Sequence, residues 1–412
     1  MAAVTDAPVT TFLSRITGAG AGRPLAVNER PIGSWAFMGF AITSFGGPLA
    51  LAALFGPGVV AGASGAAGLA MLGGVVVFAF PMAIWLRYSR EIASSGGLYS
   101  FTEAAAGRPV ALVQAGLWII SYLLYVLYTT TQIVYDTLPA VFPHVGPYQP
   151  ALEIAIPVAL AGVMVAGRGT ALVVIGLIAA GQLAITAALG GLTVAHLNTP
   201  AATFGGSAPA GDVATATAQT ALLYICGSLP LFLGGELARP ARTMRRGLIA
   251  AFLVTAAVVT IAVAPLAAAP ADTLVAIPGM TVAQQFAGRG FAVVVGVGVA
   301  VSIAGVILVE YFALSRLVTA MTSWARRPVI IAIGAVLVVF APLTLINPQQ
   351  IYSDLLTPSL VGLWASMLIV FAVYPRFAIK RGSRPLPVLV VTLAASALAI
   401  YGLWSAIAHS GT

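Results

Sequence analysis

Apolar runs of about 18 residues or more recur along the whole chain, separated by short polar segments. Residues 73–85 contain almost no polar side chain, whereas a barrel strand would be about 10 residues long and would alternate polar and apolar positions. Because only helices and closed barrels satisfy their own backbone hydrogen bonds in hydrocarbon, the runs predict transmembrane helices. About eleven spans are expected, at about 35–55, 63–86, 110–136, 150–167, 170–195, 216–237, 247–270, 290–316, 328–346, 355–374 and 386–408.

The predicted fold class is an all-α polytopic membrane protein with one transmembrane domain at 31–412. No polar block between the spans is long enough to form a separate soluble domain. Residues 1–30 lack a compact apolar segment and carry charges from Arg15 to Arg30. We therefore expect them to form a cytoplasmic tail and not a secretory signal.

Composition agrees with lipid as the solvent of this chain. Hydrophobic residues make up 60% and charged residues only 7%, against about 25% charged residues in a soluble domain. The single cysteine, Cys226, excludes a disulfide framework within the chain. The three histidines are dispersed, and no nucleophile and base are paired in the sequence pattern. We therefore expect no metal site, no cofactor and no enzymatic activity.

Basic residues predict the orientation, since Lys and Arg are retained on the cytoplasmic side of short loops. With a cytoplasmic N-terminus and eleven spans, all of the 19 Lys and Arg residues except Arg289 fall at inner helix ends. The protein is therefore expected to be a multi-pass protein of the cell (plasma) membrane. Its net charge of +8 is explained by this topology and by contact with anionic lipid, so we do not expect nucleic-acid binding.

Two spans contain a glycine and proline break in the middle. The first span carries Ser-Phe-Gly-Gly-Pro at 44–48, and the sixth carries Cys-Gly-Ser-Leu-Pro at 226–230. Breaks five spans apart favour a five-helix repeat that is inverted when it is copied, with broken helices 1 and 6. The repeats are expected at about 31–196 and 216–375, followed by an extra helix at about 386–408. The alternative is a pair of ordinary kinks, because Gly and Pro are common in membrane helices.

Such a break can bind a zwitterion. The N-terminus of the second half-helix presents N–H groups for a carboxylate, and the C-terminus of the first half presents carbonyl groups for an ammonium. Gly46 and Gly47 have no Cβ to block a ligand, and Pro48 suits the first turn of a helix. Thr43 and Ser44 are expected to offer carbonyl oxygens.

Three stretches resemble the amino acid-polyamine-organocation (APC) family of permeases. The first is Ser-Ser-Gly-Gly-Leu-Tyr at 94–99, followed by Gly107 and by Gly-Leu-Trp at 116–118. The second is Gly-Gly-Glu-Leu-Ala-Arg-Pro-Ala-Arg at 234–242, and the third runs from Ser-Arg-Leu to Pro at 315–328. They occur in the family's order and at the corresponding span ends, so the resemblance covers essentially the whole chain.

The resemblance implies a five-plus-five inverted-repeat transporter fold with substrate held between helices 1, 3, 6, 8 and 10. Family members usually have twelve spans, and this shorter form resembles the small amino-acid exporters. Arg239 stands where the family usually has Asn. Sodium-coupled relatives place an ion between helices 1 and 8, and some proton-coupled members place a lysine from helix 5 there. Here the only lysine is Lys380 in a loop, and span 5 offers Gln182 as its long polar side chain.

Polar and aromatic side chains near the breaks are the candidate site residues. Trp118, Tyr122, Tyr125 and Gln132 follow helical spacing in the third span, and either line a pocket or pack against other helices. Tyr224 near the second break is ambiguous in the same way. The residues expected to bind substrate are Thr43, Ser44, Phe45, Gly46, Gly47, Tyr125, Tyr224, Cys226, Gly227 and Ser228.

Acidic residues within the spans are the candidates for energy coupling. Glu310 lies six residues before Arg316, about 9 Å deeper along a helix, so it is protonated, paired or in contact with a watery cavity. It is expected to bind a coupling proton, with substrate pairing and a structural hydrogen bond as alternatives. Glu236 is expected to pair with nearby arginines. Acids near outer helix ends, such as Glu153, are expected to be solvated.

The sequence thus favours a secondary active transporter of amino acids that works by alternating access, with Glu310 as the candidate residue for proton coupling. The alternative is an amine or polyamine permease or exchanger, in which a membrane acid replaces recognition of the substrate carboxylate. The expected partners are an amino acid or small amine, protons and membrane lipid. The direction of transport and the oligomeric state are not set by these patterns.

Overall fold

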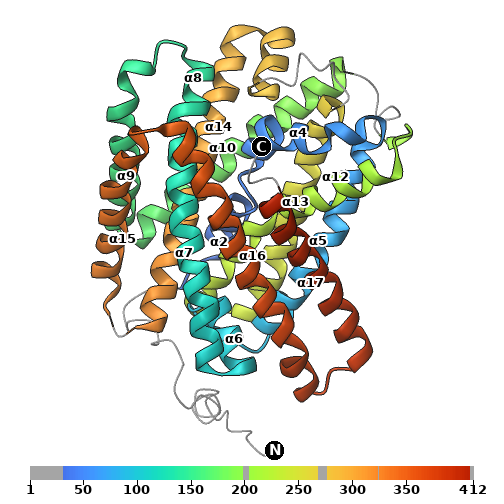
Figure 1. Cartoon of the computed structure of the whole chain (residues 1–412), viewed down its shortest axis with the longest axis vertical. Coiled ribbons are helices and arrows are strands. Elements are labelled where there is room, and N and C mark those ends of the chain that lie inside the picture. Colours follow the sequence, from blue (N-terminus) through green and yellow to red (C-terminus); the bar gives the residue numbers. More distant parts are fainter. Residues whose placement is uncertain (1–30, 198–203, 268–275, 323, 409–412) are drawn as a thin grey trace, which may run out of the picture.

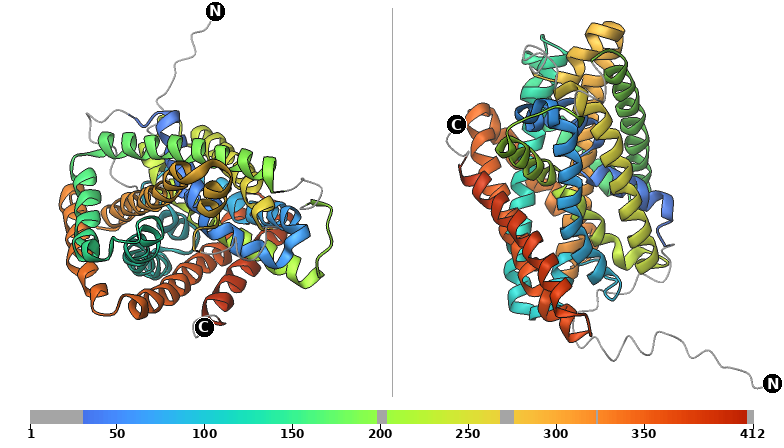
Figure 2. Two further views of the ribbon diagram at one scale, coloured as in Figure 1. Left: turned by 90° about the horizontal axis from the view of Figure 1, so that it is seen from above. Right: turned by 90° about the vertical axis from the view of Figure 1, so that its right-hand side faces the viewer.

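The computed structural model describes residues 31–197, 204–267, 276–322 and 324–408. The predicted tail at 1–30 lies outside the described residues. Within the described ranges the chain is almost entirely helical and forms no β-sheet, and its isolated bridge joins Ile32 to Leu237. The long helices run roughly along one axis and form a bundle (Figures 1 and 2).

The helices follow the predicted order. The first half contains α2 (Ser34–Ser44), α3 (Pro48–Ala50), η1 (Leu51–Phe55), α4 (Gly56–Val60), η2 (Ala61–Ala66), α5 (Ala67–Ser89), α6 (Leu98–Ala106), α7 (Arg108–Gln132), η3 (Ile133–Thr137), α8 (Leu138–Val141), η4 (Gly146–Tyr148), α9 (Gln149–Val165) and α10 (Arg168–His196). The second half contains α12 (Ala210–Leu223), η5 (Ile225–Glu236), α13 (Pro240–Ala267), α14 (Pro278–Met321), α15 (Arg326–Phe340), η7 (Ala341–Leu345), α16 (Pro348–Lys380) and α17 (Pro385–Ala408).

Ten helical stretches among the described residues are long and apolar enough to cross a membrane, as in a multi-pass membrane protein. The first, Ser34–Ser89, has 56 residues and would be about 84 Å long as one helix, against a hydrocarbon core of about 30 Å. It is two crossings, because the chain turns in η2, where Ser64 has a φ of 25°. All eleven predicted spans therefore correspond to helices.

The first membrane helix, α2 to α4, is interrupted at its centre. Gly46 and Gly47 have φ values of 86° and 68°, a region that side chains with a Cβ rarely adopt. The helix resumes with Pro48 at its first position, where a missing N–H costs no hydrogen bond. Directly afterwards η1 is a π-helical turn, a wider geometry that is often found at functional sites.

The sixth membrane helix is interrupted as well, and its second half differs from expectation. The regular helix α12 ends at Leu223, and 225–236 then continue as the 3₁₀ helix η5. Such helices rarely exceed 3–4 residues, because their hydrogen-bond geometry is poorer. The Gly-Ser-Leu-Pro sequence that predicted a local break thus lies in a long stretch of narrow helix.

The two broken membrane helices lie among the other membrane helices, and α10 and α14 pack against each other across the bundle. Helix α2 packs against α10 and α13, and α5 packs against α12 and α13. Helix α7 packs against α14 and α16, and α9 packs against α15. The eleventh membrane helix, α17, packs along α16 and also contacts α5 (Figure 1).

Ion pairs gather where helices carry basic residues. Glu91, after α5, pairs with Arg87 and with Arg381, which follows α16. Glu236 at the end of η5 pairs with arginines of three other helices, as described below. We call this end of the bundle, defined by the ion pairs of Glu91 and Glu236, the basic end.

Candidate functional site

A cavity of about 410 Å³ lies against both helix breaks. Gly46 of the first break and Ile225 and Cys226 of the second form part of its wall. The volume falls within the range of about 300–1,000 Å³ typical of small-molecule sites. The remaining wall residues are Leu51, Phe55, Tyr125, Tyr128, Gln219, Leu222, Leu223, Leu356, Thr357, Leu360, Leu363, Trp364, Gly402, Ser405 and Ala406.

The wall is mostly apolar and contains no charged side chain among the described residues. Its polar groups are few: the Gln219 amide, hydroxyl groups and the Cys226 thiol, besides the backbone at the breaks. A cavity of this kind suits a ligand with a large apolar part and a small polar part that is bound by backbone groups.

The first break places its predicted residues in different surroundings. Gly46 lines the cavity. Gly47 instead packs against α14, where a Cβ would lie only 2.4 Å from the Ser302 Oγ. The Thr43 carbonyl accepts a hydrogen bond from the Gly47 N–H (3.1 Å), and the Ser44 hydroxyl donates to the Ala41 carbonyl (2.7 Å).

Phe45 and Tyr224 turn away from the cavity into an aromatic cluster. Their ring centroids are 6.4 Å apart, and both rings pack against Phe78 and Phe252. Gly227 allows this packing, since a Cβ there would lie 2.2 Å from the Phe45 ring. The cluster thus brings residues of the two breaks into contact outside the cavity wall.

Of the aromatic residues on the third membrane helix, α7, some line the cavity and others pack against neighbouring helices. Tyr125 lines the cavity, and so does Tyr128, which was not predicted although it lies one helical turn further along. Trp118 and Tyr122 are buried but are not part of the cavity wall. The centroid of the Trp118 ring lies 4.1 Å from that of Tyr122 and 4.7 Å from that of Phe232. Gln132 is buried and is not part of the wall.

Glu310 lies directly behind the cavity wall. It is fully buried, and its Oε1 lies 3.9 Å from the Cys226 Sγ, whose residue lines the cavity. Its Oε2 has no hydrogen-bond partner among the described residues, and no basic side chain there pairs with it. The Tyr122 hydroxyl and Ser228 belong to the same buried polar cluster. The structure therefore brings Cys226, Ser228 and Glu310 together, from two helices.

A buried hydrogen-bond network links the first break to the fifth and eighth membrane helices. The Gln182 side-chain amide donates to the Thr43 Oγ1 (3.0 Å) and accepts from the Ser302 hydroxyl (2.6 Å). The Ser302 Oγ also accepts a hydrogen bond from the Ala50 N–H (3.3 Å). Both halves of the broken helix are thus bound to one polar network.

Glu236 is the centre of an ion cluster at the basic end, as expected. Its carboxylate binds Arg168 at 3.1 Å, Arg316 at 3.0 Å and Arg326 at 3.0 Å. Glu236 and Arg316 are almost completely buried. The cluster joins the ends of η5 and α14 to the starts of α10 and α15. Removing one partner would leave buried charge unpaired.

Glu153 does not behave as predicted. It was expected to be solvated, but it is fully buried, and its Oε1 accepts hydrogen bonds from Thr131 (3.0 Å) and Thr344 (2.8 Å). The expectation was wrong because the ninth membrane helix continues into η7, which covers this end of α9.

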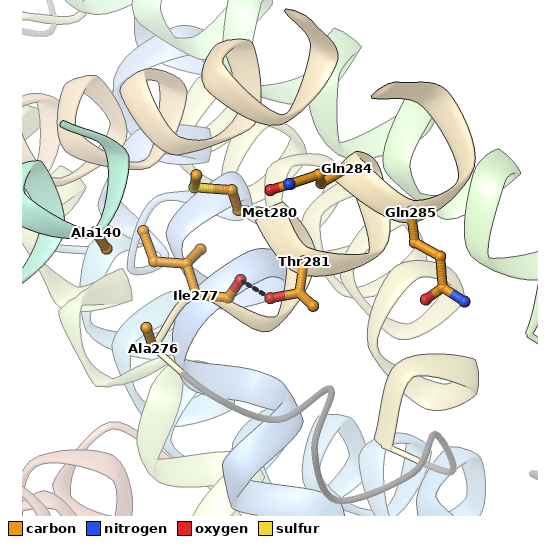
Figure 3. Close-up of a pocket in the computed structure, with 7 residues that line it drawn as sticks. All are labelled: Ala140, Ala276, Ile277, Met280, Thr281, Gln284 and Gln285. Atoms are coloured by element: carbon orange, nitrogen blue, oxygen red, sulfur yellow. Dashed lines mark hydrogen bonds between the residues drawn. The ribbon is translucent and has the colours of Figure 1, made fainter. Parts of the chain in front are cut away.

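A second cavity, of about 450 Å³, lies apart from the breaks (Figure 3). Its described wall consists of Ala140, of Ala276 and Ile277 directly before α14, and of residues in the first turns of α14 such as Met280 and Gln284. No group of three or more His, Cys, Asp or Glu residues that could hold a metal occurs in the described part of the chain. The cavity against both helix breaks is the stronger candidate site, because residues of neither break line the second cavity.

The fold and the site together define a multi-pass helical membrane protein with a five-plus-five arrangement in which helices 1 and 6 are broken beside a cavity. This fold is shared with MhsT, whose crystal structure in complex with L-phenylalanine aligns with a TM-score of 0.62. The alignment has 13% sequence identity and covers 91% of this chain and 98% of the MhsT chain. No family model matches the chain, and no curated protein matches it in sequence. The resemblance to APC permeases therefore stays a prediction.

Proposed function

We propose that the chain is a secondary active transporter that moves amino acids across the cell membrane by alternating access. The observation that carries this proposal is the cavity lined by residues of both broken helices, Gly46 and Cys226. Interrupted helices at mid-membrane supply N–H and carbonyl groups that suit the carboxylate and ammonium of one ligand. The fold shared with MhsT, which was crystallised with L-phenylalanine, supports the same substrate class.

The proposed substrate is a neutral amino acid with an apolar side chain. A charged side chain would need a partner in the wall, and the described wall has none. The apolar residues of α16 and the tyrosines of α7 instead provide surface for an apolar side chain.

Glu310 is proposed to couple transport to protons. A carboxyl group that is buried without a basic partner is stable in its protonated form. When a water-filled path opens to one side, the same group can release its proton there. Its contact with Cys226, a residue of the cavity wall, supports this proposal.

The same carboxyl group favours a second candidate function, transport of an amine or polyamine. An ionised Glu310 close to the cavity could attract a substrate ammonium without any recognition of a carboxylate. The two candidates differ in whether the ligand needs its α-carboxylate.

A thermal-shift and calorimetric screen of the purified protein separates them. L-Phenylalanine is expected to stabilise the protein, since a ligand that binds only the folded state adds RT ln(1 + [L]/Kd) to the free energy of unfolding. Phenethylamine, which lacks the carboxylate, is expected to have no effect. Stabilisation by amines alone would support the second function, and no effect of either class would contradict both.

Two variants of Cys226 test whether this cavity is the site. Cys226→Phe should abolish stabilisation by L-phenylalanine because the ring would fill the cavity. Cys226→Ser, which is similar in size to cysteine, should retain it. Equal ligand binding by both variants would place the site elsewhere.

A further inference from the structure

The eleventh membrane helix, α17, lines part of the cavity, although it follows the two predicted repeats in the sequence. Gly402 and Ser405 of α17 line the wall one helical turn apart. Ile400 and Trp404 point the other way and are 55% and 58% exposed. The helix therefore has one face toward the cavity and one toward the surroundings of the protein.

Gly402 and Trp364 are in close contact within this wall. A Cβ on Gly402 would lie 2.4 Å from the Cε2 of Trp364, closer than a carbon contact allows. The Trp364 ring belongs to the tenth membrane helix, is 2% exposed and also lines the cavity. The missing side chain of Gly402 thus lets the indole ring lie back against α17.

The wall around this contact is apolar. Leu356, Leu360 and Leu363 of α16 line the cavity on the same helix as Trp364. Residues of the two breaks, Gly46 and Cys226, line the same cavity. A zwitterion bound at the breaks can direct its side chain toward α16 and α17.

We propose that Gly402 and Trp364 form the side-chain subsite of the transporter and set the size of the substrate, which is an amino acid with a large apolar or aromatic side chain. This inference rests on the proposed function and names the substrate class of its site. The volume available to the ligand side chain depends on the position of the indole ring, which the glycine fixes. Cores and pockets packed at native density respond to a single added methyl group.

Gly402→Ala tests the subsite directly. The added methyl group pushes the indole ring away from α17 and into the cavity. Binding of L-phenylalanine and L-tryptophan should weaken about tenfold or more, whereas binding of L-alanine should change little. Affinities are measured by calorimetry, and by competition against labelled L-phenylalanine, on the purified full-length protein.

The matched control is Gly116→Ala on α7, where a Cβ would meet no atom within 4 Å. This substitution adds the same methyl group to a membrane helix and should leave both affinities unchanged. A second variant, Trp364→Leu, enlarges the subsite and should shift preference toward L-tryptophan. Combined with Gly402→Ala it should restore binding of L-phenylalanine, a rescue that general destabilisation does not produce.

The outcomes separate this inference from the proposed function. If Gly402→Ala weakens the binding of large and small amino acids equally, and Trp364→Leu does not restore it, the subsite is overturned. Amino-acid binding by the unaltered protein would then still support the proposed function. If Gly402→Ala does not fold, the test is Trp364→Leu alone. An unchanged preference of this variant between L-phenylalanine and L-tryptophan would overturn the subsite. Absence of amino-acid binding by the unaltered protein would overturn the proposed function and the subsite together.

Discussion

At the scale of single residues, the two glycines of the first break have different tasks. Gly46 lines the cavity, whereas Gly47 brings the backbone close to Ser302 of α14. Both have positive φ values, which the Gly-Gly-Pro sequence predicted as a break. The neighbours Leu223 of Gly46 and Ser302 of Gly47 could not be predicted, because both lie on helices far along the chain.

Gly47→Ala is expected to destabilise the protein by about 1–3 kcal/mol and to weaken ligand binding, since the methyl group collides with Ser302. Gly288→Ala is the matched control. Gly288 also has a positive φ, of 83°, but a Cβ there meets no atom within 4 Å. Thermal unfolding with and without L-phenylalanine measures both variants. Equal effects of the two substitutions would show that backbone strain, and not the contact with α14, matters at Gly47.

Glu310→Gln tests the coupling role. A glutamine cannot carry a proton through the cycle, so accumulation driven by a pH gradient should be lost while exchange of substrate across the membrane is retained. Loss of ligand binding would instead indicate direct pairing with the substrate ammonium. Unchanged transport in both assays would leave only a structural role.

Glu153→Gln is the matched control for Glu310→Gln. Glu153 is also fully buried, but it bonds two threonines and does not belong to the cavity wall. Its amide can still accept both hydrogen bonds, so coupling should be preserved. A loss of coupling in this variant as well would remove the special role assigned to Glu310.

At the scale of elements, hydrophobic runs in the sequence were enough to predict the spans, and Gly and Pro residues were enough to predict both interrupted helices. They did not predict the long 3₁₀ helix after Tyr224, because the Pro and Gly residues mark an interruption but not its geometry. They also missed the burial of Glu153 and the cavity-lining face of α17, which depend on contacts between distant helices. Of the predicted binding residues, Gly46, Tyr125 and Cys226 line the cavity.

The network around Gln182 positions both halves of the first membrane helix. Gln182→Leu removes two hydrogen bonds and leaves the Thr43 and Ser302 hydroxyls without this partner. We expect a loss of about 1–3 kcal/mol in the free energy of unfolding, together with weaker substrate binding, because the break loses its support. Chemical denaturation and calorimetry measure the two effects. Gln219→Leu, at the cavity wall, is the control for stability, and its unfolding should change less.

At the scale of the whole molecule, a buried ion cluster stabilises the basic end of the bundle. The Glu236 cluster joins four helices at the basic end. It lies ten residues beyond Cys226, about 20 Å along a 3₁₀ helix, so the cavity is separated from the basic end by packed chain. The proposed alternating access predicts that this ion cluster opens when the cavity faces the basic end.

The proposed orientation has its own test. A cysteine introduced at Gly411, in a Cys226→Ala background, should react from outside intact cells with a thiol reagent that cannot cross membranes. The eleven-helix topology with a cytoplasmic N-terminus predicts this result. Labelling only after the cytoplasmic side is exposed would contradict the topology.

Uptake of labelled L-phenylalanine by proteoliposomes that contain only this protein tests the central claim most directly. We predict saturable uptake that is faster with a pH gradient across the membrane, is competed by neutral apolar amino acids and is not competed by phenethylamine. Cys226→Phe should abolish it. No uptake or exchange of any neutral amino acid, in either direction of the gradient and with correctly folded protein, would contradict the account.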